Sequence, residues 1–182
     1  MRGRYAVGAV TDRSPYAWLF TVLAAPLAIA LLYSSVGFAQ DVDQAAVDAG
    51  LKVFKTTGVC QDCHGWNGDG GMPGDEGPAG PSLIITHLDW EGIVEVVRCG
   101  RPSTGMPRHS MTAWSAKEAC YDMVAEDVGD QLPPSPEGQW LRPSQIENVA
   151  SYIIAVYKGK QMTLENCERF FSKGARSCNE YR

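Results

Sequence analysis

Apolar residues recur at helical spacing most regularly in residues 144–158. This stretch places apolar side chains on one face of a helix. They are Ile146, Val149, Ile153, Ile154 and Tyr157. Ser144 followed by Glu147 has the spacing of a capping box, and Gly159 is placed to end the helix. The pattern therefore predicts an amphipathic helix as the last long element of the chain.

Three shorter stretches show a weaker form of the same periodicity: residues 43–56, 89–97 and 118–128. Gly58 follows the first stretch and is a natural stop, while Asp89 is a plausible N-cap for the second. We expect each of the three stretches to form a helix.

Glycine and proline dominate residues 65–81, and prolines also crowd residues 132–136. Such composition favours loops over regular elements. No stretch alternates apolar and polar residues convincingly enough to predict a strand. The sequence therefore predicts an all-α fold in which long loops join the helices and wrap an irregular object.

The N-terminal region has the layout of a secretory signal. Arg2, Arg4 and Arg13 precede an apolar stretch over residues 17–32, and the stretch ends in small residues that include Ala39. We expect residues 1–39 to be a signal peptide cleaved after Ala39, with a periplasmic mature protein. An uncleaved anchor is the alternative, because the apolar stretch is nearly long enough to span a bilayer.

Charge narrows the range of partners. The chain of 182 residues carries a net charge of −5, which becomes −7 without residues 1–39 because three arginines and one aspartate are lost. An acidic protein is a poor binder of nucleic acid, so we expect none as a partner.

The length that remains without residues 1–39, about 140 residues, suits one domain. We place this domain at residues 40–160, followed by a C-terminal extension at 161–182.

The residues Cys60-Gln61-Asp62-Cys63-His64 spell C-x-x-C-H, the attachment motif of a c-type haem. Two thiols at this spacing can reach the two vinyl groups on one edge of a porphyrin. The next residue, His64, then lies where its imidazole can bind the iron. Thiol–disulfide oxidoreductases and zinc sites also use C-x-x-C, so the motif alone leaves those readings open.

A second iron ligand must come from further along the chain, and residues 101–111 offer Met106, His109 and Met111. Met106 lies between Gly105 and Pro107, in a polar loop where core packing explains a methionine poorly. A thioether favours Fe(II) and suits electron transfer. We favour Met106, with Met111 next, and His109 or an open iron as the remaining alternatives.

These features together resemble a class I monohaem cytochrome c. The resemblance covers residues 43–158 and rests on the C-x-x-C-H motif, the segment Gly80-Pro81-Ser82-Leu83, the methionine-proline loop and the final helix. It implies one covalently bound haem c, ligated by His64 and Met106. It also implies that the carbonyl of Pro81 accepts a hydrogen bond from His64, and that Phe54 and Tyr152 lie where the first and last helices cross.

Four cysteines remain: Cys99, Cys120, Cys167 and Cys178. An even number in an exported protein indicates disulfides, with three connectivities open. We favour Cys99–Cys120, which brackets the methionine loop, and Cys167–Cys178, which ties down the C-terminal extension. Four free buried thiols are the alternative.

The segments around these extra cysteines are similar to small periplasmic cytochromes linked to methanol metabolism. They include Cys99-Gly100-Arg101-Pro102 and Cys120-Tyr121-Asp122-Met123. The resemblance implies an electron-transfer protein and not an enzyme. Its donor would be a quinoprotein alcohol dehydrogenase that uses PQQ, and its electrons would pass on to a terminal oxidase.

Other readings remain open from sequence. A haem enzyme or gas sensor would have an open distal site, and a subunit of a respiratory complex would keep its N-terminal anchor in the membrane. Arg98 and Arg101 flank Cys99 and are candidates to neutralise haem propionates. The acidic residues in 69–76 lack the ligand spacing of a known calcium loop.

Overall fold

The computed structural model describes residues 43–70 and 80–182. The expected signal segment, its cleavage site and most of residues 69–76 lie outside this range. Within it the regular elements are helical, and two isolated bridges take the place of strands. The longer helices are α2 (Gln44–Lys52), α4 (Trp90–Cys99), α6 (Pro143–Tyr152) and α7 (Leu164–Phe170). The shorter ones are η1 (Val53–Thr57), α3 (Gln61–His64), α5 (Ala125–Val128), η2 (Gly129–Gln131), η3 (Ile153–Tyr157) and η4 (Arg176–Tyr181).

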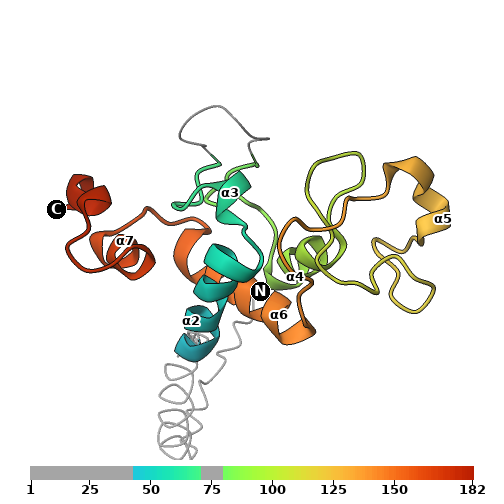
Figure 1. The fold of residues 1–182 in the computed structure, drawn as a ribbon, viewed down its shortest axis with the longest axis horizontal. Coiled ribbons are helices and arrows are strands. Elements are labelled where there is room, and N and C mark those ends of the chain that lie inside the picture. The colour runs from blue at the N-terminus through green and yellow to red at the C-terminus, as the bar shows by residue number, and fades with distance from the viewer. Residues whose placement is uncertain (1–42, 71–79) are drawn as a thin grey trace, which may run out of the picture. The chain divides into compact units, whose positions relative to one another are not determined.

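Helices α2 and α6 pack against each other, as Figure 1 shows in teal and orange. Their backbones come close because Gly50 has no side chain. A Cβ there would lie 2.0 Å from the carbonyl oxygen of Asn148 and 2.7 Å from Cβ of Tyr152. Each helix continues into a π-helical turn, α2 into η1 and α6 into η3. The predicted helices at 43–56 and 144–158 are therefore both present.

Aromatic rings fill the contact between these two helices. The ring of Phe54 lies 5.6 Å from that of Tyr152 and 5.3 Å from that of Tyr157, measured between centroids. All three side chains are buried. The expectation that Phe54 and Tyr152 meet where the first and last helices cross is confirmed.

Helix α4 begins where the sequence predicts, because the side chain of Asp89 accepts a hydrogen bond of 2.9 Å from Gly92 N. The capping box predicted for Ser144 and Glu147 is wrong. Helix α6 starts at Pro143, a residue well suited to the first helical position, and Gln145 Oε1 accepts from Arg142 N at 3.0 Å.

The helix predicted for residues 118–128 is also wrong, apart from the short α5. Residues Tyr121 and Asp122 have φ values of 53° and 60°, which an α-helix does not allow. Cys120 pairs with Cys99 in a disulfide and forms a bridge with Met123. The covalent bond and its tight turn override the local helical pattern.

The C-terminal extension contains α7 and η4, joined by the disulfide Cys167–Cys178. Its aromatic residues pack around Trp66, which follows the C-x-x-C-H motif. The ring of Trp66 lies 5.8 Å from Phe170, 4.9 Å from Phe171 and 6.0 Å from Tyr181 between centroids. Both favoured disulfide pairings are confirmed.

In the part of the chain that the structure describes, no helix combines the length and the apolar composition needed to cross a bilayer.

Candidate haem site

The C-x-x-C-H motif lies on the single turn of α3, with Cys60 as its N-cap. Cys60 and Cys63 are the two cysteines left outside the disulfides, so both thiols are free for thioether bonds. Burial raises the pKa of the Cys60 thiol to about 12. Burial also raises the pKa of Cys63, helped by the carboxylates of Glu137 and Asp62. Redox-active C-x-x-C pairs instead depend on a lowered thiol pKa, so this environment argues against a thiol–disulfide oxidoreductase.

His64 is buried, and its Nδ1 lies 2.9 Å from the carbonyl oxygen of Pro81. The carbonyl can only accept, so Nδ1–H donates and the lone pair of Nε2 is free to bind a metal. Burial lowers the pKa of His64, although the hydrogen bond to Pro81 raises it and the charge of Arg101 lowers it further. The imidazole is therefore neutral near pH 7, in the form that binds iron.

Gly80 is the residue that lets Pro81 approach the imidazole. A Cβ at Gly80 would lie 2.8 Å from both Cε1 and Nδ1 of His64 and 3.0 Å from the carbonyl oxygen of Cys63. The Gly80 amide donates to that same carbonyl at 2.7 Å. Sequence reasoning assigned the hydrogen bond to Pro81 but missed the contact that Gly80 makes possible.

The methionine loop, residues 101–111, folds back on the end of α4. Gly100 has a φ of 67°, and a Cβ there would lie 2.7 Å from Arg108 N, from the carbonyl oxygen of Met106 and from the carbonyl carbon of Pro107. Arg101 N donates to the carbonyl oxygen of Met106 at 3.2 Å. The backbone of Met106 is thus held by contacts within its own loop, including the hydrogen bond from Met106 N to Thr104 Oγ1, and the residue is half-buried.

The other two candidate ligands differ in exposure. Met111 is 69% exposed and lies at the surface, which leaves it poorly placed to bind a buried iron. His109 is only 3% exposed, and burial lowers its pKa to about 4. Among the residues described, its Nδ1 has no hydrogen-bond partner. Nothing in the sequence pattern marks this histidine as buried.

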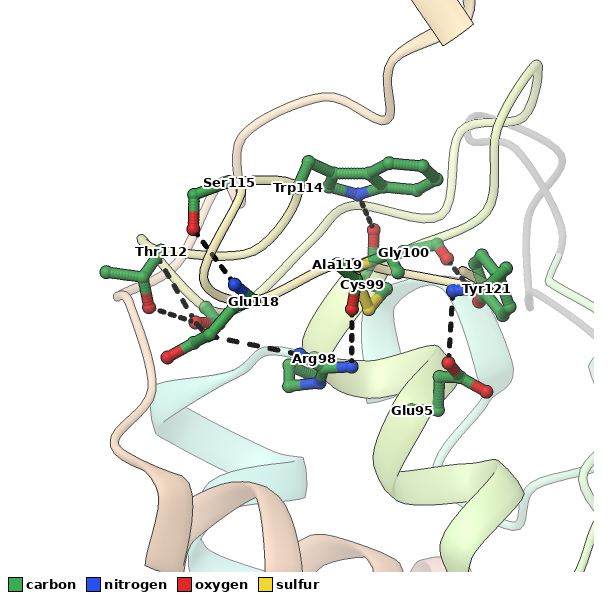
Figure 2. Close-up of a disulfide and its surroundings, with 12 residues drawn as sticks. Glu95, Arg98, Cys99, Gly100, Thr112, Trp114, Ser115, Glu118, Ala119 and Tyr121 are labelled. Carbon is green, nitrogen blue, oxygen red and sulfur yellow. Dashed lines mark hydrogen bonds and ion pairs between the residues drawn. A yellow bond between two sulfur atoms is a disulfide. The ribbon is translucent and has the colours of Figure 1, made fainter. Parts of the chain in front are cut away.

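The disulfide Cys99–Cys120 anchors a loop beside the end of α4 (Figure 2). Trp114 Nε1 donates to the carbonyl oxygen of Cys99 at 2.7 Å, and Tyr121 OH donates to that of Gly100 at 2.7 Å. These bonds tie residues 114–121 to the start of the methionine loop. Trp114 is buried beside Cys99 and Cys120, so it is a residue of the hydrophobic core.

Arg98 belongs to this loop contact. It donates to the carbonyl oxygen of Ala119 at 3.1 Å and pairs with Glu118 at 4.0 Å (Figure 2). Its guanidinium is therefore already engaged by residues 118 and 119. Arg101 is exposed and close enough to His64 for its charge to lower the pKa of that imidazole. Of the two arginines, Arg101 is the better candidate to face a haem propionate.

Residues 45–126 match the family model described as Cytochrome C oxidase, cbb3-type, subunit III. The matched part contains the C-x-x-C-H motif, Pro81 and Met106. No curated protein and no solved structure matches the chain. The match over residues 45–126 indicates a c-type cytochrome domain, and the helical architecture is consistent with a class I-like fold. Such a domain implies covalently bound haem c. The match does not address the finer resemblance to cytochromes of methanol metabolism.

The residues present fit that cofactor. Two cysteines stay outside the disulfides, and the adjacent histidine presents Nε2 while its Nδ1 is held by Pro81. The structure brings Cys63, His64 and Pro81 together at one place. Met106 lies in a separate loop, and its role as second ligand stays a prediction.

Proposed function

We propose that this protein is a periplasmic single-electron carrier whose haem is attached through Cys60 and Cys63, with His64 and Met106 as iron ligands. The bound haem supplies a one-electron Fe(III)/Fe(II) couple. The observation that carries the proposal is the 2.9 Å hydrogen bond between His64 Nδ1 and Pro81, beside two cysteines that no disulfide uses.

The chain's own residues act by holding positions and excluding water. Pro81 fixes the orientation and tautomer of His64 and strengthens its donation through Nε2. The core where α2 and η1 pack against α6 and η3 contains Phe54, Tyr152 and Tyr157, all buried. The Cys99–Cys120 disulfide restrains the loop that carries Met106. A rigid, dry site of this kind changes little between oxidation states, which suits rapid electron transfer.

For partners, we propose a quinoprotein alcohol dehydrogenase as electron donor and a cytochrome or terminal oxidase as acceptor. The support is the resemblance to methanol-linked cytochromes around Cys99 and Cys120. The acidic charge of the mature chain, −7, also favours a partner that presents a basic surface.

The first test is the absorption spectrum of the purified protein, oxidised and then reduced. We expect a sharp reduced α-band and, in the oxidised protein, a weak near-infrared sulfur-to-iron band. Met106→Ala should abolish that band, whereas Met111→Ala, at an exposed methionine of the same loop, should leave it intact. A wild-type protein that lacks the band and binds carbon monoxide would instead support the open-iron enzyme or sensor.

A second candidate function is a haem subunit of a membrane-bound respiratory oxidase. The family match over residues 45–126 favours it, because that family is described as an oxidase subunit. Two measurements separate the candidates: whether the native protein needs detergent for extraction, and whether an alcohol dehydrogenase reduces it. Extraction without detergent together with reduction by the dehydrogenase would support the periplasmic carrier.

A further inference from the structure

His109 is held at a fixed place behind the methionine loop. Its backbone N–H donates to the carbonyl oxygen of Val97 at 3.1 Å, and its carbonyl oxygen accepts from Leu141 N at 2.9 Å. The first bond ties it to α4, and the second ties it to the segment that leads into α6. Only 3% of its surface is exposed, so the residue lies inside the fold.

The imidazole is buried with an incomplete set of hydrogen bonds. Within residues 43–70 and 80–182, its Nδ1 finds no partner. The neighbouring hydroxyl of Ser110 is already engaged by Thr112 Oγ1 at 3.1 Å and Glu118 Oε2 at 3.3 Å. A buried polar atom without a partner costs about 1–3 kcal/mol, so such a group calls for an explanation, and a role at a redox site is one.

Burial alone accounts for the lowered pKa of His109, which is about 4. The imidazole is therefore neutral near pH 7. A neutral imidazole carries one N–H, and with the proton on Nδ1 this atom can donate to a weak acceptor. A thioether sulfur is such an acceptor.

Met106 stands three positions before His109 in the same loop, and its backbone is fixed by Arg101 and Thr104. Its side chain is half-buried. We propose that His109 Nδ1–H donates a hydrogen bond to the sulfur of Met106 when that sulfur binds the haem iron, so that His109 is a positioning residue for the distal ligand. This inference rests on the proposed function, in which Met106 is the second ligand.

The hydrogen bond has two consequences. It holds the sulfur toward the iron, and it withdraws electron density from the sulfur. A less electron-rich thioether stabilises Fe(III) less, so the reduction potential rises. Loss of the bond should therefore lower the potential and make Met106 easier to displace.

Three variants of the holoprotein test the assignment atom by atom. His109→Asn keeps an N–H close to the position of Nδ1, His109→Gln moves it toward Nε2, and His109→Leu removes it. The measurements are the energy of the near-infrared sulfur-to-iron band, the reduction potential, and the rate at which added imidazole displaces the methionine from ferric iron. His87→Leu, at an exposed histidine, is the matched control.

We expect His109→Leu and His109→Gln to shift the band, lower the potential and speed displacement about fivefold, the equivalent of one neutral hydrogen bond. His109→Asn should keep wild-type values, and a merely structural role would not produce this rescue.

Three variants with an unchanged band would overturn the inference. An unchanged band together with a potential that becomes newly dependent on pH would also overturn it, because a haem propionate would then be the acceptor. Absence of the band in the wild-type protein would instead refute the ligation by Met106 on which the inference rests.

Discussion

Gly80 controls the contact between His64 and Pro81, because a side chain there would meet the imidazole at 2.8 Å. We expect Gly80→Ala to push the ring off the Pro81 carbonyl and to lower the free energy of unfolding by about 1–3 kcal/mol. Denaturant unfolding of the holoprotein, followed by haem absorbance, measures the change.

Gly105 offers the control for that substitution, since among the described residues other than its chain neighbours none has an atom within 4 Å of a Cβ built there. Gly105→Ala should leave both stability and spectrum close to those of the wild-type protein. An equal loss of stability in the two variants would mean that the contact at Gly80 has no special importance.

At the scale of single residues, the spacing of Cys60 and Cys63 predicts thioether attachment. The resemblance to class I cytochromes c predicted the contact between His64 and Pro81, which is present at 2.9 Å. The burial of His109 and the close approach at Gly80 depend on segments distant in the chain. Neither residue type signals such a contact, because histidine and glycine are both common in exposed loops.

Among the elements, the loop held by Cys99–Cys120 lies directly beside the methionine segment. We expect Cys99→Ser/Cys120→Ser to lower the free energy of unfolding by about 3 kcal/mol, because the unfolded chain regains the entropy of an open loop. The freed loop should also release Met106, so the near-infrared band should disappear at a lower temperature than in the wild-type protein.

The pair Cys167→Ser/Cys178→Ser is the matched control for the first disulfide. Removal of this second disulfide should lower the free energy of unfolding. The near-infrared band should then disappear only when the whole protein unfolds, and not at a lower temperature. If both pairs affected the band alike, the first disulfide would have no particular role at the methionine loop.

A hydroxyl network links the π-helical turn η3 to the segment after the haem motif. Tyr157 OH donates to the carbonyl oxygen of Trp66 at 2.6 Å and lies 3.1 Å from Tyr152 OH. Burial, with a smaller effect of Tyr152, raises the pKa of Tyr157 above its ordinary value. Above about pH 10 the unfolded chain loses this proton while the folded chain keeps it, so stability falls as the pH rises.

We therefore expect wild-type stability to fall as the pH rises above about 9. Tyr157→Phe should show a shallower fall because the tyrosine with the most strongly raised pKa no longer titrates. Near pH 8 the variant should be less stable by about 1 kcal/mol, the value of one hydrogen bond. Urea unfolding of the ferrous protein at several pH values measures both effects. Identical slopes for the two proteins would contradict the assignment to Tyr157.

Element prediction succeeded where burial and local pattern agreed. The stripe in residues 144–158 and the N-cap at Asp89 produced helices near their predicted positions. It failed over residues 118–128, where the positive φ values of Tyr121 and Asp122 accompany a covalent bond to α4. The periodicity of apolar residues does not indicate which cysteine forms a disulfide with Cys120.

For the molecule as a whole, net charge affects the rate at which the protein associates with a redox partner. Without residues 1–39 the chain would carry −7, and it should then associate fastest at low salt with a basic donor, because screening weakens long-range attraction. We expect the second-order rate constant for reduction by a basic quinoprotein dehydrogenase to fall several-fold as ionic strength rises from about 10 to about 200 mM. Stopped-flow absorbance measures it.

Reduction by a neutral hydroquinone is the control for that experiment and should depend little on salt. A rate with the dehydrogenase that rises with salt would indicate repulsion between the two proteins, and that donor would have to be abandoned.

The aromatic partners of Trp66 also bear on the order in which the molecule is completed. Phe170, Phe171 and Tyr181 lie more than 100 residues after Trp66, which itself comes two residues after His64. During synthesis the attachment motif therefore emerges long before the residues that cover its neighbour. A chain that stopped after α6 and η3 would possess Cys60, Cys63, His64 and Met106 yet lack the three rings that pack against the indole, so Trp66 gains these contacts only after residue 181 has been synthesised.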